Sequence, residues 1–226
     1  MPQRTSLVTS DQTELSNFLF GKGLEIEDLT QSISRAIAAY NNTTKNHPAT
    51  YRGFMITAET NVALREILAA RGYVKKAPSN IEITVSDEHK FGIHVLRGDQ
   101  ETGMLSGYPC SLRAKGVLSQ EFFGLTTSAT NQIDMFSEEL PNHTSPKCPY
   151  DIWFLMLYVI KDEHSGVTIR AELSKPEYCS QKGIINGFSK RYLIDMQSFM
   201  DTLIIDLDES PDEGFSDDLD IDISLM

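Results

Sequence analysis

The hydrophobic periodicity of the chain changes near Pro78, and this change limits the folds that the chain can adopt. Before Pro78, apolar residues recur every three or four positions, as they do on one face of a helix. After it, IEITVS (81–86) and FGIHVLR (91–97) alternate apolar and polar residues on either side of the short polar stretch DEHK, which predicts a hairpin of two strands. We therefore expect an α+β fold in which an N-terminal helical segment, residues 1–78, precedes a mainly antiparallel sheet.

Three helices are expected in the N-terminal segment. The first begins after Asp11, which forms an approximate capping box with Glu14 three residues later. The second has an apolar stripe at helical spacing and ends near Asn41. The third is expected from Thr60 to Arg71, where a glycine follows and can end it.

The β-rich part, residues 79–200, is expected to belong to the same domain. The run DIWFLMLYVI (151–160) is almost continuously apolar, which favours a central strand covered on both faces. A turn separates it from a second strand, GVTIRAEL (166–173), and a third is expected near 190–194. Residues 126–149 are rich in Ser, Thr, Asn and Pro and are expected to form a long loop.

The C-terminal segment, residues 201–226, is an acidic tail. The chain has a formal charge of −12, of which −10 belongs to the tail and −2 to residues 1–200. The tail ends in LDIDISLM, in which apolar residues alternate with polar ones. This alternation is typical of a strand added to a sheet edge, either of this chain or of a partner. A solvated acidic terminus is the alternative interpretation.

Composition argues against several classes of protein. No run approaches the roughly 18 apolar residues of a membrane helix, and the start of the chain lacks the apolar stretch of a signal peptide. We therefore expect a cytoplasmic protein that does not insert into a membrane. The three cysteines and five histidines are scattered, without the spacing of a zinc site, so no metal or other cofactor is expected.

One short segment indicates a partner. Gln132, Ile133, Asp134, Met135 and Phe136 form the pentapeptide QIDMF within the 126–149 loop. It resembles the motif of the form Q-L-S/D-L-F through which replication and repair proteins bind the bacterial β sliding clamp. Ile133 and Met135 replace leucines with side chains of similar size and polarity. The resemblance implies that the chain binds the clamp, and possibly DNA through it.

A second set of residues is compatible with an enzyme. Asp151 precedes one strand, and Glu172 and Lys175 lie near the end of the next. These residues loosely resemble the PD-(D/E)-x-K nuclease core, which implies two carboxylates that hold Mg²⁺ and a lysine that assists the attacking water. Compared with the family pattern, this chain has one extra residue between Pro149 and Asp151 and one extra residue between Glu172 and Lys175. Because side chains alternate along a strand, the extra residue before Lys175 predicts that Lys175 and Glu172 point to opposite faces.

Three functions remain open from the sequence. The favoured hypothesis is an accessory protein of DNA metabolism or defence, from a bacterium or mobile element, that docks on the sliding clamp through QIDMF. The second is a Mg²⁺-dependent nuclease that uses Asp151, Glu172 and Lys175. The third is an interaction module whose acidic tail pairs with a partner's sheet edge or imitates the charge of DNA.

Overall fold

The computed structural model describes residues 6–48, 50–127, 148–162 and 166–197, and residues 1–196 form one compact unit. A mixed sheet lies at its centre, in the order β1-β8-β7-β6-β4-β3-β2, and β5 pairs with β7 outside this path. The strands are β1 (Leu7–Thr9), β2 (Val74–Lys76), β3 (Ile83–Ser86), β4 (Phe91–Arg97), β5 (Thr126–Thr127), β6 (Asp151–Asp162), β7 (Gly166–Cys179) and β8 (Ile185–Ile194).

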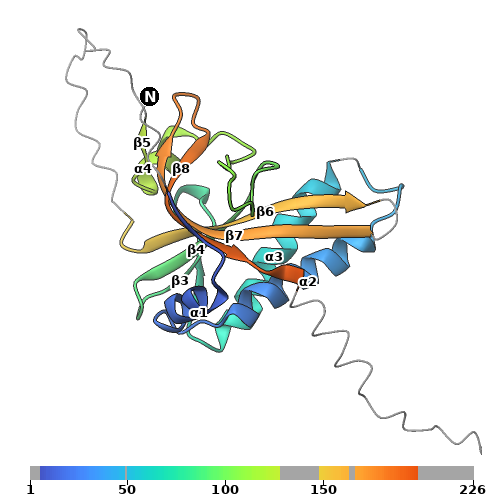
Figure 1. Cartoon of the computed structure of the whole chain (residues 1–226), viewed down its shortest axis with the longest axis horizontal. Helices are drawn as coiled ribbons and strands as arrows, with labels where there is room; N and C mark the ends of the chain where they lie inside the picture. The colour runs from blue at the N-terminus through green and yellow to red at the C-terminus, as the bar shows by residue number, and fades with distance from the viewer. Residues whose placement is uncertain (1–5, 49, 128–147, 163–165, 198–226) are drawn as a thin grey trace, which may run out of the picture. The chain divides into compact units, whose positions relative to one another are not determined.

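The helices are α1 (Gln12–Phe20), α2 (Ile26–Asn41), α3 (Tyr51–Ala69) and the short α4 (Val117–Phe122), with a 3-10 turn η1 at Pro78–Asn80. In Figure 1, α2 and α3 lie side by side across one face of the long strands. The α+β prediction is therefore confirmed. None of the helices among the described residues combines the length and apolar character needed to cross a membrane.

The prediction of a mainly antiparallel sheet is wrong, because the sheet is mixed. The expected hairpins form: β3 pairs with β4, and β6 with β7, in antiparallel fashion. However, β4 pairs with β6, and β1 with β8, in parallel. Alternation of apolar and polar residues predicts a strand but carries no information on the direction of its neighbour, so these long-range pairings could not be read from the pattern.

Both faces of β6 are covered, as its apolar run predicts. Trp153, Leu155 and Leu157 pack with the helices, whereas Phe154 and Met156 belong to a second apolar cluster on the opposite face. All five are at most 5% exposed. Residues 98–127, including α4, contribute to the cover of this second face.

The first two helices follow the sequence prediction closely, and the third does not. The carboxylate of Asp11 accepts a hydrogen bond from the backbone N–H of Thr13 (2.8 Å) and caps α1. The third helix begins at Tyr51, nine residues before the predicted Thr60. The additional turns contain Gly53, a poor helix former, yet they bury Met55 and Ile56. Tertiary packing therefore outweighs local preference in this part of α3.

Candidate functional site

Glu172, one of the predicted nuclease residues, lies in a buried ion pair with Arg191 of β8. Arg191 Nε and Nη2 donate to the two Glu172 carboxylate oxygens, at 3.0 and 2.5 Å. Both side chains are at most 1% exposed. The Ser174 hydroxyl donates a further hydrogen bond to Glu172 (2.7 Å). With its charge compensated and its oxygens already bonded, this carboxylate is not free to hold a metal ion.

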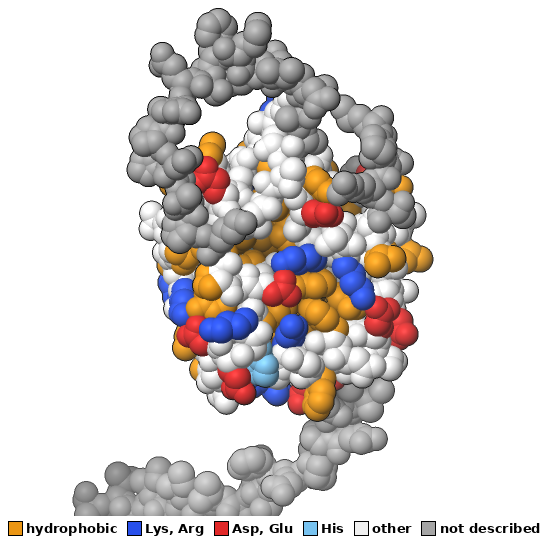
Figure 2. All heavy atoms as spheres, turned by 90° about the vertical axis from the view of Figure 1, so that its left-hand side faces the viewer, with side chains coloured by type: hydrophobic (Ala, Val, Ile, Leu, Met, Phe, Trp, Pro, Cys, Tyr) orange, Lys and Arg blue, Asp and Glu red, His pale blue; other side chains and the backbone are white. Residues whose placement is uncertain are grey.

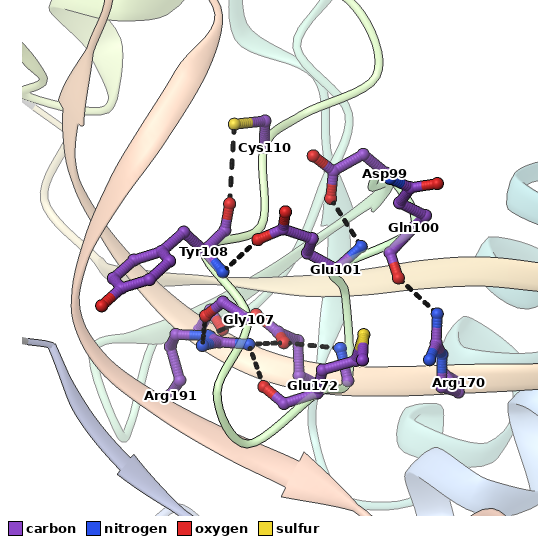
Figure 3. Close-up of polar contacts among 12 residues, drawn as sticks. Asp99, Gln100, Glu101, Gly107, Tyr108, Cys110, Arg170, Glu172 and Arg191 are labelled. Atoms are coloured by element: carbon purple, nitrogen blue, oxygen red, sulfur yellow. Dashed lines mark hydrogen bonds and ion pairs between the residues drawn. The ribbon is translucent and has the colours of Figure 1, made fainter.

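The ion pair holds the loop after β4 against the sheet. Arg191 donates to the carbonyl oxygens of Gly107 (2.6 Å) and Met104 (3.2 Å), and the Gly103 N–H donates to Glu172 (2.8 Å). Figure 3 shows Glu172 and Arg191 beneath this loop, with their hydrogen bonds directed at its backbone. The pair therefore positions residues 103–107, a structural role that explains its burial.

Asp151 and Lys175, the other two predicted nuclease residues, do lie together. Lys175 Nζ contacts Asp151 Oδ1 at 2.5 Å, and the Trp153 indole N–H donates to Asp151 Oδ2 at 3.0 Å. Burial acts to raise the pKa of Asp151, but the hydrogen bonds from Lys175 and Trp153 outweigh it, so this pKa lies below its ordinary value. Asp151 is therefore an ionised carboxylate with a cation already beside it.

The structure does not bring Asp151 and Glu172 together. Glu172 is paired with Met156, five residues along β6 from Asp151, which corresponds to about 16 Å at the usual strand rise. Because five is an odd number of positions, the two side chains also point to opposite faces of the sheet. Among the described residues, no group of three or more His, Cys, Asp or Glu is arranged to hold a metal ion. The geometry required by the nuclease hypothesis is not formed by these residues.

Two predicted interaction segments lie outside the described residues. The pentapeptide Gln132–Phe136 falls within 128–147, and the acidic tail falls within 198–226. The clamp-binding and tail-pairing hypotheses therefore remain predictions from sequence.

A cleft of about 1430 Å³ opens beside β4, between α3 and the segment that leads into α4. We call it the basic cleft. β3 pairs with β4 only as far as Ile93, so among the described strands none lies beside the rest of β4 on that side. One wall comes from α3 and the other from residues 111–123, which are attached to β4 by the Leu112 N–H to Arg97 carbonyl hydrogen bond (2.9 Å). The floor includes residues 94–97.

The basic cleft concentrates positive charge on a chain that is acidic overall. Its cationic lining residues are Lys45, Arg52, Arg65, Arg97, Arg113, Lys115 and Lys161. Glu82 is the one acidic residue among the described residues that line it, and it already pairs with Arg65 (2.6 Å) and Lys75 (3.1 Å). Charges of one sign in a cleft with low-dielectric walls reinforce each other's field, so the cleft attracts anions.

Arg97 is one of three cleft residues, with Asn61 and Arg65, that have a buried polar atom without a partner in the described part of the chain. Its Nε is buried and has no hydrogen-bond partner in the described part of the chain. Gly53 of α3 makes room for the guanidinium, since a Cβ at that position would lie 2.5 Å from Arg97 Nη1. A guanidinium presents donors in a fixed fork that suits phosphate or carboxylate. The absence of a side chain at Gly53 thus provides the space that this guanidinium occupies.

His94 and Lys115 form a second polar contact in the cleft. His94 Nδ1 lies 2.7 Å from the Glu82 carbonyl oxygen, and Lys115 Nζ lies 3.2 Å from His94 Nε2. Burial, together with the charge of Lys115, lowers the pKa of His94 to about 4. The ring is therefore neutral at pH 7, and it donates from Nδ1 to the carbonyl and accepts from the lysine at Nε2. Burial also lowers the pKa of Lys115.

The face drawn in Figure 2 lacks this accumulation of one charge among its described residues. Figure 2 shows the side where α1 and β3 lie, and there Lys and Arg side chains are mixed with Asp and Glu side chains around hydrophobic ones. Glu14 of α1 pairs with Lys190 (2.7 Å), and Asp87, just after β3, pairs with Lys76 (3.0 Å). Neighbouring charges cancel on such a surface, so it does not single out an anionic ligand.

Sequence reasoning did not find the basic cleft. Its cations come from five separate segments of the chain, and the sequence around each cation matches no recognisable motif. The nearest local feature is the pair Arg113 and Lys115 just before α4, which matches no motif. No protein-family model, curated protein or solved structure matches the chain.

Proposed function

We propose that this chain is a DNA-metabolism or defence accessory protein that binds the phosphate backbone of a nucleic acid in the basic cleft. The observation that supports this most directly is the gathering of seven Lys and Arg side chains in one cleft, where Glu82 is the one acidic residue among the described lining residues. Like charges that lie close together strengthen each other's attraction for anions, and a phosphate backbone supplies several anions to neutralise them.

The size of the cleft favours an extended ligand. Its volume of about 1430 Å³ exceeds the roughly 300–1,000 Å³ of a typical small-molecule site. The cations also come from separate elements: α3, β4, β6 and the segments that precede α3 and α4. Several phosphates in a row match such a distribution better than one compact anion does.

Salt-dependent binding tests this proposal. Fluorescence anisotropy with labelled single-stranded and duplex oligonucleotides should show binding that weakens steeply with added salt, because counterions are released from the phosphates. Replacing Arg113 and Lys161 with glutamine should weaken binding and reduce the log–log salt slope by about 1.4 to 1.8, or 0.7 to 0.9 per lost phosphate contact.

The matched control removes the same charge elsewhere. Arg35 and Lys90 are exposed and do not line the cleft, so the double variant Arg35→Gln/Lys90→Gln should bind as wild type does. If both double variants lose the same affinity for the oligonucleotide, net charge alone explains the effect and the cleft is not the binding site. Absence of binding to every oligonucleotide at low salt would refute the proposal.

Docking on the bacterial β sliding clamp through Gln132–Phe136 is the second part of the proposal, supported by the pentapeptide sequence. A clamp tether at micromolar affinity would raise the local concentration of the basic cleft on DNA, in the cytoplasm. The full chain should bind purified clamp, and Phe136→Ala should weaken this by about 2 kcal/mol, as for a central aromatic anchor. If wild type and Phe136→Ala bind the clamp equally, the pentapeptide is not the docking segment.

A further inference from the structure

Phe54 gives the basic cleft an apolar surface beside its cations. It lies in the first turn of α3, lines the cleft, and is 70% exposed. Within the described residues, no other aromatic ring or cation is stacked on its ring. Most of a large aromatic side chain is thus open to a ligand, within a site whose other notable property is positive charge.

The face of α3 that lines the cleft continues this apolar surface. Phe54, Ala58 and Val62 recur every four residues, so they form one row on the helix. At 1.5 Å per residue, the row extends over about 12 Å from Phe54 to Val62. Val62 is 42% exposed, and Leu112 on the opposite wall is 48% exposed. Both walls therefore carry exposed apolar side chains as well as cations.

We infer that the basic cleft binds single-stranded nucleic acid, with an unpaired base stacked on Phe54 and phosphates held by the surrounding cations. This inference rests on the proposed function and specifies its ligand. In a duplex the base faces are stacked on one another and are not available to a side chain, whereas in a single strand they are free to stack on an aromatic ring. A row of exposed apolar groups beside cations therefore fits a single strand.

The test measures the affinity of the full chain for four labelled probes by anisotropy: a mixed-sequence single strand, its duplex, an abasic strand of the same length, and inorganic polyphosphate. The single strand should bind at least about tenfold more tightly than the duplex at equal salt. Phe54→Ala should weaken single-strand binding by about 5- to 100-fold, as expected when one base–aromatic stack is lost. Binding of the abasic strand and of polyphosphate should be unchanged by this substitution.

Phe20→Ala is the matched control, because Phe20 is 81% exposed and does not line the cleft. It should leave all four affinities unchanged, and circular dichroism should show that both variants are folded. If Phe54→Ala and Phe20→Ala bind the single strand as wild type does, or if the duplex binds as tightly as the single strand, the inference is overturned while the proposed function stands. If wild type binds none of the nucleic acids, the proposed function fails as well.

Discussion

The buried pair of Glu172 and Arg191 provides the sharpest test of how the second face of the sheet is held. Arg191→Met removes the positive charge and keeps a flexible apolar side chain of comparable length. The Glu172 carboxylate then remains at 0% exposure with only the Gly103 N–H and the Ser174 hydroxyl as partners. Removing one member of a buried pair in this way costs about 3–5 kcal/mol.

This loss is large enough for ordinary measurements. For a protein of this size, 1 kcal/mol shifts the melting temperature by about 2–4 °C, so Arg191→Met should melt about 6–20 °C below wild type. Urea denaturation should show a lower midpoint with an unchanged slope. Hydrogen exchange at the Gly103 amide should also accelerate, because its acceptor loses the charge that holds it in place.

A double-mutant cycle separates the ion pair from its surroundings. Glu172→Met together with Arg191→Met removes both charges, so the double variant should be more stable than Arg191→Met alone by about 2 kcal/mol or more. It should not regain wild-type stability, because the carbonyl oxygens of Met104 and Gly107 lose their donors, at about 1 kcal/mol each. A loss below about 1 kcal/mol in Arg191→Met, or additive effects in the cycle, would refute this reasoning.

Three other substitutions test further parts of the structure. The folded state keeps His94 neutral down to about pH 4, whereas the unfolded chain takes up the proton below about pH 6.5. Wild type should therefore lose up to about 3 kcal/mol of folding stability relative to His94→Gln as the pH falls from 6.5 to 4. Urea denaturation at each pH measures this difference. Gly53→Ala should stabilise α3 by up to about 1 kcal/mol in thermal unfolding, yet weaken oligonucleotide binding, because the added Cβ displaces the tip of Arg97. Lys175→Met should cost at most about 1 kcal/mol in the same assay, since its pair with Asp151 is partly exposed and solvent screens it; a loss comparable to that of Arg191→Met would contradict this.

Local sequence patterns predicted those elements whose stabilising contacts are close in the chain. The Asp11 cap, the apolar stripe of α2 and the alternation in β3 and β4 each describe an element that carries its own periodicity. The continuous apolar run of β6 also revealed that both of its faces are covered. In each case the information lies within about 15 residues, because periodicity reflects which side of a single element meets the core.

Other features depended on contacts between distant segments. The parallel pairings of β4 with β6 and of β1 with β8 required the positions of other elements, as did the early start of α3. The resemblance to the nuclease core predicted that Glu172 helps to hold Mg²⁺, but a short motif does not say which groups cover a residue or pair with it. Arg191, nineteen residues away, and the 103–107 loop determine that Glu172 is buried and paired.

The basic cleft is a feature that depends wholly on contacts between distant segments. Lys45, Arg97, Arg113 and Lys161 are ordinary isolated cations in the sequence, and the acidic tail dominates the net charge. Folding brings them to one side of β4, and electrostatic potential depends on distance in space and not on separation along the chain. The sequence alone determined the types of the local elements and the clamp-like pentapeptide; only the tertiary structure created a concentrated positive field with an exposed aromatic ring inside it.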